Sequence, residues 1–245
     1  MKKIAYLLIL FISISFTSCQ FTEEITLNKN GSGQYKLNMD MSAMMGAMSE
    51  MGENDSIKKE KEKIDSTFYF KDIIEQNKDS IAQLSKDQQE ALEALKDLKM
   101  HIHLDEEKGE MLYDFILDFK NLSELDNIKS KVEKAQKLQD NKGDSEESIE
   151  NHDIFYSYTK KHFTRKVVMK DLTAEEQESY NAKMEESKMF LGGSMYKLIY
   201  HFPKKIKNVN YKDAQFSSDH KTMTIEVAMD SLTKNPMLLD LKVDF

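Results

Sequence analysis

The sequence predicts an α+β fold: a mainly antiparallel sheet, built from hairpins and a C-terminal meander, with helices packed on one face. Segments of alternating apolar and polar residues follow one another closely and are joined by short turn sequences, as in antiparallel sheets. Segments of helical periodicity interrupt them, which is typical of an α+β arrangement. No shift in composition divides the chain of 245 residues, so residues 19–245 are predicted to form a single domain.

The first predicted element is a β-hairpin that begins two residues after Cys19. Residues 21–27 alternate loosely, residues 28–33 (NKNGSG) form a turn cluster, and residues 34–41 alternate again. The period then changes. The next methionines fall at i, i+3, i+4, i+7 and i+10, which is the stripe of an amphipathic helix: Met41, Met44, Met45, Met48 and Met51.

The middle of the chain is mainly helical around one clear hairpin. Residues 52–66 are charged and predict an exposed loop or a solvated helical turn. Helical patterning covers residues 70–82, and a capping box at Ser85 begins a second helix over residues 86–98. Residues 100–120 alternate on both sides of a short turn, which predicts a hairpin.

The remainder of the chain returns to strands. Residues 121–138 predict a helix and residues 139–151 a polar loop. Residues 153–169 are β-rich and form one long strand or two, and a capping box begins a helix over residues 174–191. The last fifty residues predict the meander, with strands at 194–202, 210–217, 222–230 and 238–245.

The first eighteen residues have the pattern of a signal peptide. Two lysines precede an apolar run (residues 4–16), which is shorter than the roughly 20 residues of a transmembrane helix. The sequence FTSC (residues 16–19) follows and resembles the lipobox of bacterial lipoproteins, although its first two residues depart from the commonest ones. The resemblance implies cleavage after residue 18, acylation of Cys19 and attachment to a membrane. An ordinary signal peptide cut nearby is the alternative.

The residues that follow Cys19 indicate to which membrane the lipoprotein is delivered. In lipoproteins of this kind, Asp at the next position marks retention in the inner membrane, so Gln20 implies the outer membrane. Glu23 and Glu24 resemble surface-export signals of some bacterial groups, so both the periplasmic face and the cell surface stay open. The opening hairpin with its NGSG turn, and the segment YHFPKKIKNVN…SSDHKTMTIEV near the C-terminus, resemble LppM-like exported lipoproteins. That likeness implies an α+β lipid-anchored domain, with lipid binding proposed for some members.

Composition and motifs argue against two functional classes. The net charge is −8, whereas nucleic-acid binding requires clustered Lys and Arg. The sequence has no Gly-rich phosphate loop, nucleophile elbow or HExxH motif, and its one arginine disfavours anion clamps. We therefore predict a protein that is not an enzyme, has no cofactor and does not bind nucleic acid.

Two histidines are the weak candidates for a metal site. His101 and His103 lie two residues apart on a predicted strand and so share a face, which is compatible with metal ligation. Asp105 is a conceivable third ligand. A polar outer face, with Ile102 and Leu104 packed inward, explains the same pattern. We favour that interpretation and predict no metal.

Two further clusters are open to interpretation. The β-rich segment 153–169 combines aromatic and basic residues: Phe155, Tyr156, Tyr158, Lys160, Lys161, Phe163, Arg165 and Lys166. Such a combination occurs in patches that bind carbohydrate or lipid headgroups. We favour the alternative, a strand with one face on a core. The methionine stripe has three interpretations. Packing of a helix against the core is favoured, a surface that faces lipid or a partner comes second, and Cu(I) binding comes third.

The predicted function is a non-enzymatic lipoprotein of the cell envelope that acts as a binding or structural module. Its predicted partners are the membrane, through the anchor at Cys19, and a lipid or envelope protein. The alternative is a lipid carrier or sensor that holds an acyl chain near the Met-rich helix. A periplasmic Cu(I)-binding protein ranks third.

Overall fold

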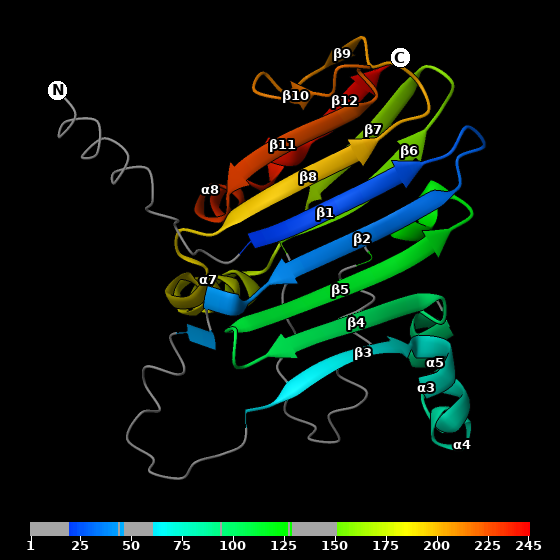
Figure 1. Ribbon diagram of the computed structural model, residues 1–245, viewed down its shortest axis with the longest axis vertical. Coiled ribbons are helices and arrows are strands. Elements are labelled where there is room, and N and C mark those ends of the chain that lie inside the picture. The colour runs from blue at the N-terminus through cyan, green and yellow to red at the C-terminus, as the bar shows by residue number, and fades with distance from the viewer. Residues whose placement is uncertain (1–19, 44, 47–60, 94, 127, 129–150) are drawn as a thin grey trace, which may run out of the picture.

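The computed structural model describes residues 20–43, 45–46, 61–93, 95–126, 128 and 151–245, and it confirms the α+β class. One sheet has eight strands in the order β10-β11-β8-β1-β2-β5-β4-β3, and a second has four in the order β6-β7-β12-β9. Figure 1 shows the small sheet behind the β11–β8–β1 part of the large one. The strands of the large sheet, in its spatial order, are β10 (Gln215–Phe216), β11 (Thr222–Ala228), β8 (Met195–His201), β1 (Gln20–Leu27), β2 (Gly33–Asp40), β5 (Glu110–Phe119), β4 (Leu98–Asp105) and β3 (Lys63–Tyr69). Those of the small sheet are β6 (His152–Tyr158), β7 (His162–Met169), β12 (Leu241–Asp244) and β9 (Asn208–Val209).

Sheet pairing confirms the two predicted hairpins, β1 with β2 and β4 with β5, and β6 also pairs with β7; all three pairings are antiparallel and join strands that are neighbours in sequence. Among the other pairings is a parallel one of β1 with β8, which sets Gln20 beside Met195 and Thr26 beside His201. This pairing brings the C-terminal third of the chain against the strand that follows Cys19.

The core lies between the two sheets, where alternate side chains of each strand point inward. Ile25, Leu198 and Tyr200 are fully buried on the large sheet, and Phe163 and Val243 on the small one. The Phe163 ring lies edge-on, at 5.3 Å between centroids, to that of Tyr200, an arrangement that aromatic pairs prefer. The large sheet is thus held to the small one mainly by apolar contacts.

Gly33 allows β1, β2 and β5 to approach closely. A Cβ atom at this position would lie 2.0 Å from the carbonyl oxygen of Thr26 and 2.6 Å from Phe119 Cζ. Neither neighbour is a freely movable chain end, because one is backbone and the other is a buried ring. The second glycine of NGSG therefore serves strand packing, whereas the first serves the turn.

The helices lie around the edges of the large sheet. Figure 1 shows α3, α4 and α5 beside β3 and β4, and α7 and α8 near the starts of β1 and β8. The predicted capping box of α7 is confirmed, because Glu176 N–H donates to Thr173 Oγ1 (3.3 Å) and Thr173 N–H donates to Glu176 Oε2 (2.7 Å). The helices are α3 (Phe70–Gln76), α4 (Lys78–Ile81), α5 (Lys86–Glu93), α7 (Ala174–Leu191) and α8 (Met229–Lys234), with 3₁₀ turns η1 (Leu122–Leu125) and η2 (Pro236–Leu239).

Several segments differ from prediction. The end of the charged segment 52–66 belongs to a strand, β3, in which Ile64 pairs with Leu104 and Phe68 with Met100 of β4. The predicted helix over 70–82 is divided at Asn77, whose side-chain amide donates to the Ile73 carbonyl (2.8 Å). Residues 153–169 form two strands joined by a turn.

The C-terminal strands do not form one continuous meander. After β11 the chain passes through α8 and η2, and its last strand, β12, joins the small sheet. Pro236 at the start of η2 cannot donate a ladder hydrogen bond, and it marks where the chain changes layers. Of the predicted helix 121–138, the structure describes the 3₁₀ turn η1 and Ile128; the rest lies outside the described residues.

Candidate functional site

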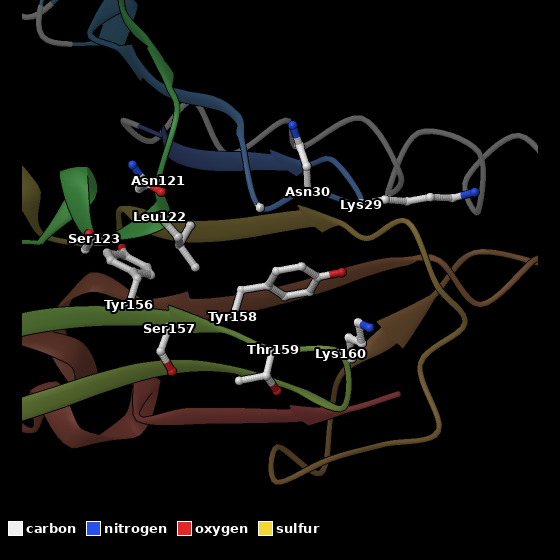
Figure 2. Close-up of a pocket in the computed structure, with 11 residues that line it drawn as sticks. Lys29, Asn30, Asn121, Leu122, Ser123, Tyr156, Ser157, Tyr158, Thr159 and Lys160 are labelled. Atoms are coloured by element: carbon white, nitrogen blue, oxygen red, sulfur yellow. The ribbon is translucent and has the colours of Figure 1, made fainter.

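A pocket of about 430 Å³ lies where three loops meet. The turn between β1 and β2 forms one side, the start of η1 another, and the end of β6 with its following turn the third. Figure 2 shows the Tyr158 ring between Asn30 and Lys29 on one side and Thr159 and Lys160 on the other. The polar lining residues used below are Lys29, Asn30, Asn121, Ser123, Tyr158 and Lys160.

The β1–β2 turn has a fixed shape that presents Lys29 and Asn30. Asn28 N–H donates to the Ser32 carbonyl (2.8 Å), and Asn30 Oδ1 accepts from Ser32 N–H (3.2 Å). Gly31 has φ of 86°, a conformation that glycine adopts without strain. The turn lies against the Tyr158 ring, because an added Cβ at Gly31 would make an ordinary contact with Tyr158 Cδ1 at 3.7 Å.

The β6–β7 turn presents Lys160 in a similar way. Thr159 N–H donates to the His162 carbonyl (2.8 Å), and Thr159 Oγ1 accepts from His162 N–H (3.0 Å). Lys204, which follows β8, donates through Nζ to the Lys160 carbonyl (2.6 Å). A turn held by both its own residues and a neighbouring segment is a rigid support for a binding side chain.

The pocket is positively charged although the protein is acidic. Lys29 and Lys160 line it, and no carboxylate does. Within the described residues neither lysine makes an ion pair, in contrast to Lys36, which pairs with Asp114 (3.0 Å), and Lys99, which pairs with Asp118 (2.8 Å). The two ammonium groups are therefore available to an anionic ligand.

Tyr158 contributes an aromatic surface. Its ring is half-buried and lies edge-on to Phe245, at 6.0 Å between centroids. Burial raises the pKa of its hydroxyl above the usual value, so the group is a neutral donor at physiological pH. That hydroxyl makes no hydrogen bond to another described residue, which leaves it free to bind a ligand.

A buried polar network lies next to the pocket. Tyr156, which also lines the pocket, donates through its hydroxyl to Glu23 Oε1 (3.1 Å). Tyr196 donates to Glu23 Oε2 (2.7 Å), and Tyr200 donates to Glu23 Oε1. Glu23 is 2% exposed. Carboxylates in protein interiors need such donors, because burying an unpaired charge is very unfavourable.

Arg165 supplies the counter-charge in this network. Its Nε lies 3.8 Å from Glu23 Oε1, and its Nη1 donates to the Leu239 carbonyl (2.9 Å). Nε itself is buried without a hydrogen-bond partner among the described residues. The network joins β1 and β8 of the large sheet to β6 and β7 of the small one, so its role in this structure is to hold the two sheets together.

The sequence did not predict this network. Glu23 was interpreted as part of a surface-export signal, yet its side chain points into the core. Its position in the alternation of Phe21, Ile25 and Leu27 was the available signal, because these residues share one face of β1.

Only part of the predicted methionine stripe falls within the described residues. Met41 and Met45 are partly buried, and Met41 N–H donates to the Met111 carbonyl of β5 (2.8 Å). The short helical segment at residues 42–46 agrees with the predicted start of the Met-rich helix, apart from residue 44, which the structure does not describe. The remaining predicted positions lie outside the described residues: Cys19, Met44, Met48 and Met51.

The two histidines pair with carboxylates on the outer face of the large sheet. His101 Nε2 lies 2.9 Å from Asp65 Oδ1, and His103 Nε2 lies 3.2 Å from Glu110 Oε2. The His101 hydrogen bond lowers the pKa of the Asp65 carboxyl. Asp105, the conceivable third ligand, instead accepts from the backbone N–H of Lys108 (3.2 Å) at the β4–β5 turn.

Within the described residues, no group of three or more His, Cys, Asp or Glu side chains is placed to hold a metal ion. None of the helices in that part of the chain is long and apolar enough to cross a membrane. Comparison with protein-family models, curated proteins and solved structures finds no match. The likeness to LppM-like lipoproteins therefore stays a prediction from the sequence.

Proposed function

We propose that this chain is a non-enzymatic binding module of the cell envelope, anchored to the outer membrane through lipid on Cys19. The observation that carries the proposal is the position of β1, which begins at Gln20. The lipobox resemblance supplies the anchor, and the strand that follows it is a central strand of the large sheet. A lipid on Cys19 would thus be attached to the fold without a flexible linker.

This attachment would place one end of β1 at the membrane and the other end away from it. β1 has eight residues, which corresponds to about 26 Å at the rise of a strand. The Met-rich segment follows β2, whose last residue, Asp40, lies beside Gln20 at the anchored end. The pocket lies beyond Leu27, at the opposite end of β1. The proposed module therefore presents its pocket away from the membrane that holds it.

Replacing Cys19 with Ser tests the anchor. Serine has no thiol for acylation, so Cys19→Ser should move nearly all of the protein from washed membranes to the soluble fraction, as measured by fractionation and immunoblot. A single acyl chain binds a membrane only marginally, so the several chains of an acylated Cys19 would account for stable attachment. Gln20→Asp is the matched control, which should stay membrane-bound and shift to the inner membrane. A Cys19→Ser protein that remains in washed membranes would refute lipid anchoring.

A second candidate function, an acyl-chain carrier, is favoured by one apolar surface. Leu37 and Met39 of β2, Tyr113 of β5 and Met100 of β4 pack against the core and remain partly exposed. They lie on the inner face of the large sheet, and β2 leads from them to Met41. Thioether side chains adapt readily to varied apolar ligands, so an acyl chain fits this surface chemically.

Lipid extraction tests the carrier function. The Cys19→Ser protein, which carries no covalent lipid, would be purified without detergent, extracted and examined by mass spectrometry. A carrier should yield about one lipid per chain, and Met39→Gln should reduce that yield because the amide is polar at nearly the same length. Protein free of lipid would argue against a carrier and leave the anchored binding module as the function.

A further inference from the structure

The lining of the pocket suits a hydroxylated ring. Asn121 and Ser123 of the η1 segment supply amide and hydroxyl groups, and Asn30 of the β1–β2 turn supplies a second amide. The half-buried Tyr158 ring offers an aromatic surface for the apolar face of a sugar, and its free hydroxyl offers a polar end. Pockets that combine a few fixed polar groups with an aromatic ring are typical of small-ligand sites.

The charge of the pocket selects for acidic ligands. Lys29 and Lys160 are exposed, come from two different turns and have no carboxylate partner among the described residues. Lys161 and Lys205 on neighbouring segments likewise make no ion pair within that part of the chain, so they extend the positive surface. Hydrogen bonds from an ammonium group to a carboxylate or phosphate are about twice as strong as neutral ones.

The direction of the module decides between possible sources of such a ligand. With Cys19 in the membrane, the pocket lies about one strand length, roughly 26 Å, from the anchored end. Headgroups of that same membrane are out of reach when β1 stands upright on it, and the phosphate probe below distinguishes a headgroup from a glycan. A polymer that extends through the space beside the membrane can enter an open pocket at the far end of the sheet.

We propose that this pocket binds acidic sugar units of an envelope glycan, with the ring against Tyr158 and the acidic group between Lys29 and Lys160. The preference for a glycan over a lipid headgroup rests on the proposed function, because it depends on the anchor at Cys19. The binding itself is independent of the anchor, because the pocket belongs to the folded chain.

Calorimetric titration of the full chain, purified in detergent, tests the site. The probes are an oligogalacturonate, the neutral oligosaccharide of the same length, and inorganic phosphate. We expect the oligogalacturonate to bind at least about tenfold more tightly than either of the others, and the double variant Lys29→Gln/Lys160→Gln to lose at least about tenfold of that affinity. Tyr158→Ala should weaken binding of the oligogalacturonate and leave that of phosphate unchanged.

Lys86→Gln is the control, because Lys86 is an exposed lysine on α5 that does not line the pocket and should leave binding unchanged. The proposal is overturned if the neutral oligosaccharide binds as tightly as the acidic one, if phosphate alone does so, or if no probe binds. It is also overturned if Lys86→Gln weakens binding as much as the double variant, since the effect would then reflect overall charge. Membrane retention of Cys19→Ser would refute the anchor and leave these titrations interpretable.

Discussion

An Arg165→Met variant is expected to lose about 3–5 kcal/mol of its free energy of unfolding. Arg165 is 4% exposed and Glu23 is 2% exposed. Removing the guanidinium leaves the Glu23 carboxylate in the core with tyrosine hydroxyls as donors but with no counter-charge. An uncompensated buried charge is one of the few causes of destabilisation this large from a single substitution.

The reciprocal variant separates charge from hydrogen bonding. Glu23→Gln keeps an oxygen that can accept from the tyrosine hydroxyls, yet it leaves Arg165 buried without its anion, so it should also destabilise the fold. In the double variant both charges are absent. We expect its loss of stability to be smaller than the sum of the two single losses by about 1–3 kcal/mol.

Urea unfolding followed by circular dichroism measures all three variants. Lys166→Met is the matched control, because Lys166 is the next residue on β7 and its ion pair with Asp240 (2.6 Å) is largely exposed. Exposed pairs of this kind contribute less than about 1 kcal/mol. Equal losses in Arg165→Met and Lys166→Met would contradict the view that the buried pair holds the two sheets together.

Local patterns were sufficient to predict the hairpins and the capped helix. Strict alternation on both sides of a short turn predicted residues 100–120, and the structure has β4 and β5 there. The Thr173–Glu176 capping box predicted the start of α7. Such signals lie within a few residues of the element that they specify, so they do not depend on the rest of the fold.

Long-range pairing could not be predicted in the same way. The β1–β8 pairing brings Tyr196 to Glu23, which is 173 positions away in sequence. No local pattern indicates which distant strand will lie beside β1, or that the strands divide into two sheets. For the same reason the burial of Glu23, which the sequence linked only to a surface-export signal, was not predicted.

The candidate site illustrates both cases. The segment 153–169 was interpreted as either a core strand or a ligand patch, and the structure divides it between the two. Tyr156 and Phe163 are buried, whereas Tyr158 and Lys160 line the pocket. Lys29 comes from a separate hairpin, and only the tertiary arrangement of the two turns brings it to the same pocket.

Alkaline unfolding of this protein is expected to be unusually steep. Burial raises the pKa values of four tyrosines, Tyr35, Tyr156, Tyr196 and Tyr200, and the negative charge of Glu23 raises them further. The folded chain therefore keeps these four protons at a pH where the unfolded chain releases them. The resulting stabilisation is complete below the unfolded-state pKa of about 10 and is lost as the pH rises from there toward the folded-state values.

The size of the effect follows from proton linkage. Each retained proton contributes about 1.4 kcal/mol per pH unit, so four tyrosines give a slope of about 5.6 kcal/mol per pH unit above pH 10. A domain of ordinary stability, about 5–15 kcal/mol, would unfold within roughly one to three pH units of that point. Circular dichroism and tyrosinate absorbance, recorded over the same pH series, should therefore change together.

Tyr35→Phe isolates the contribution of one proton. Tyr35 makes no hydrogen bond to Glu23, so the variant removes an ionisable group and leaves the bonds of the network in place. Its unfolding should move to higher pH, with a slope smaller by about 1.4 kcal/mol per pH unit. Tyr69→Phe, at a side chain that is 40% exposed, should unfold like the unmodified protein. Gradual ionisation of all the tyrosines near pH 10 without loss of secondary structure would contradict the linkage, because tyrosines that ionise within the folded state cannot be held neutral by the core.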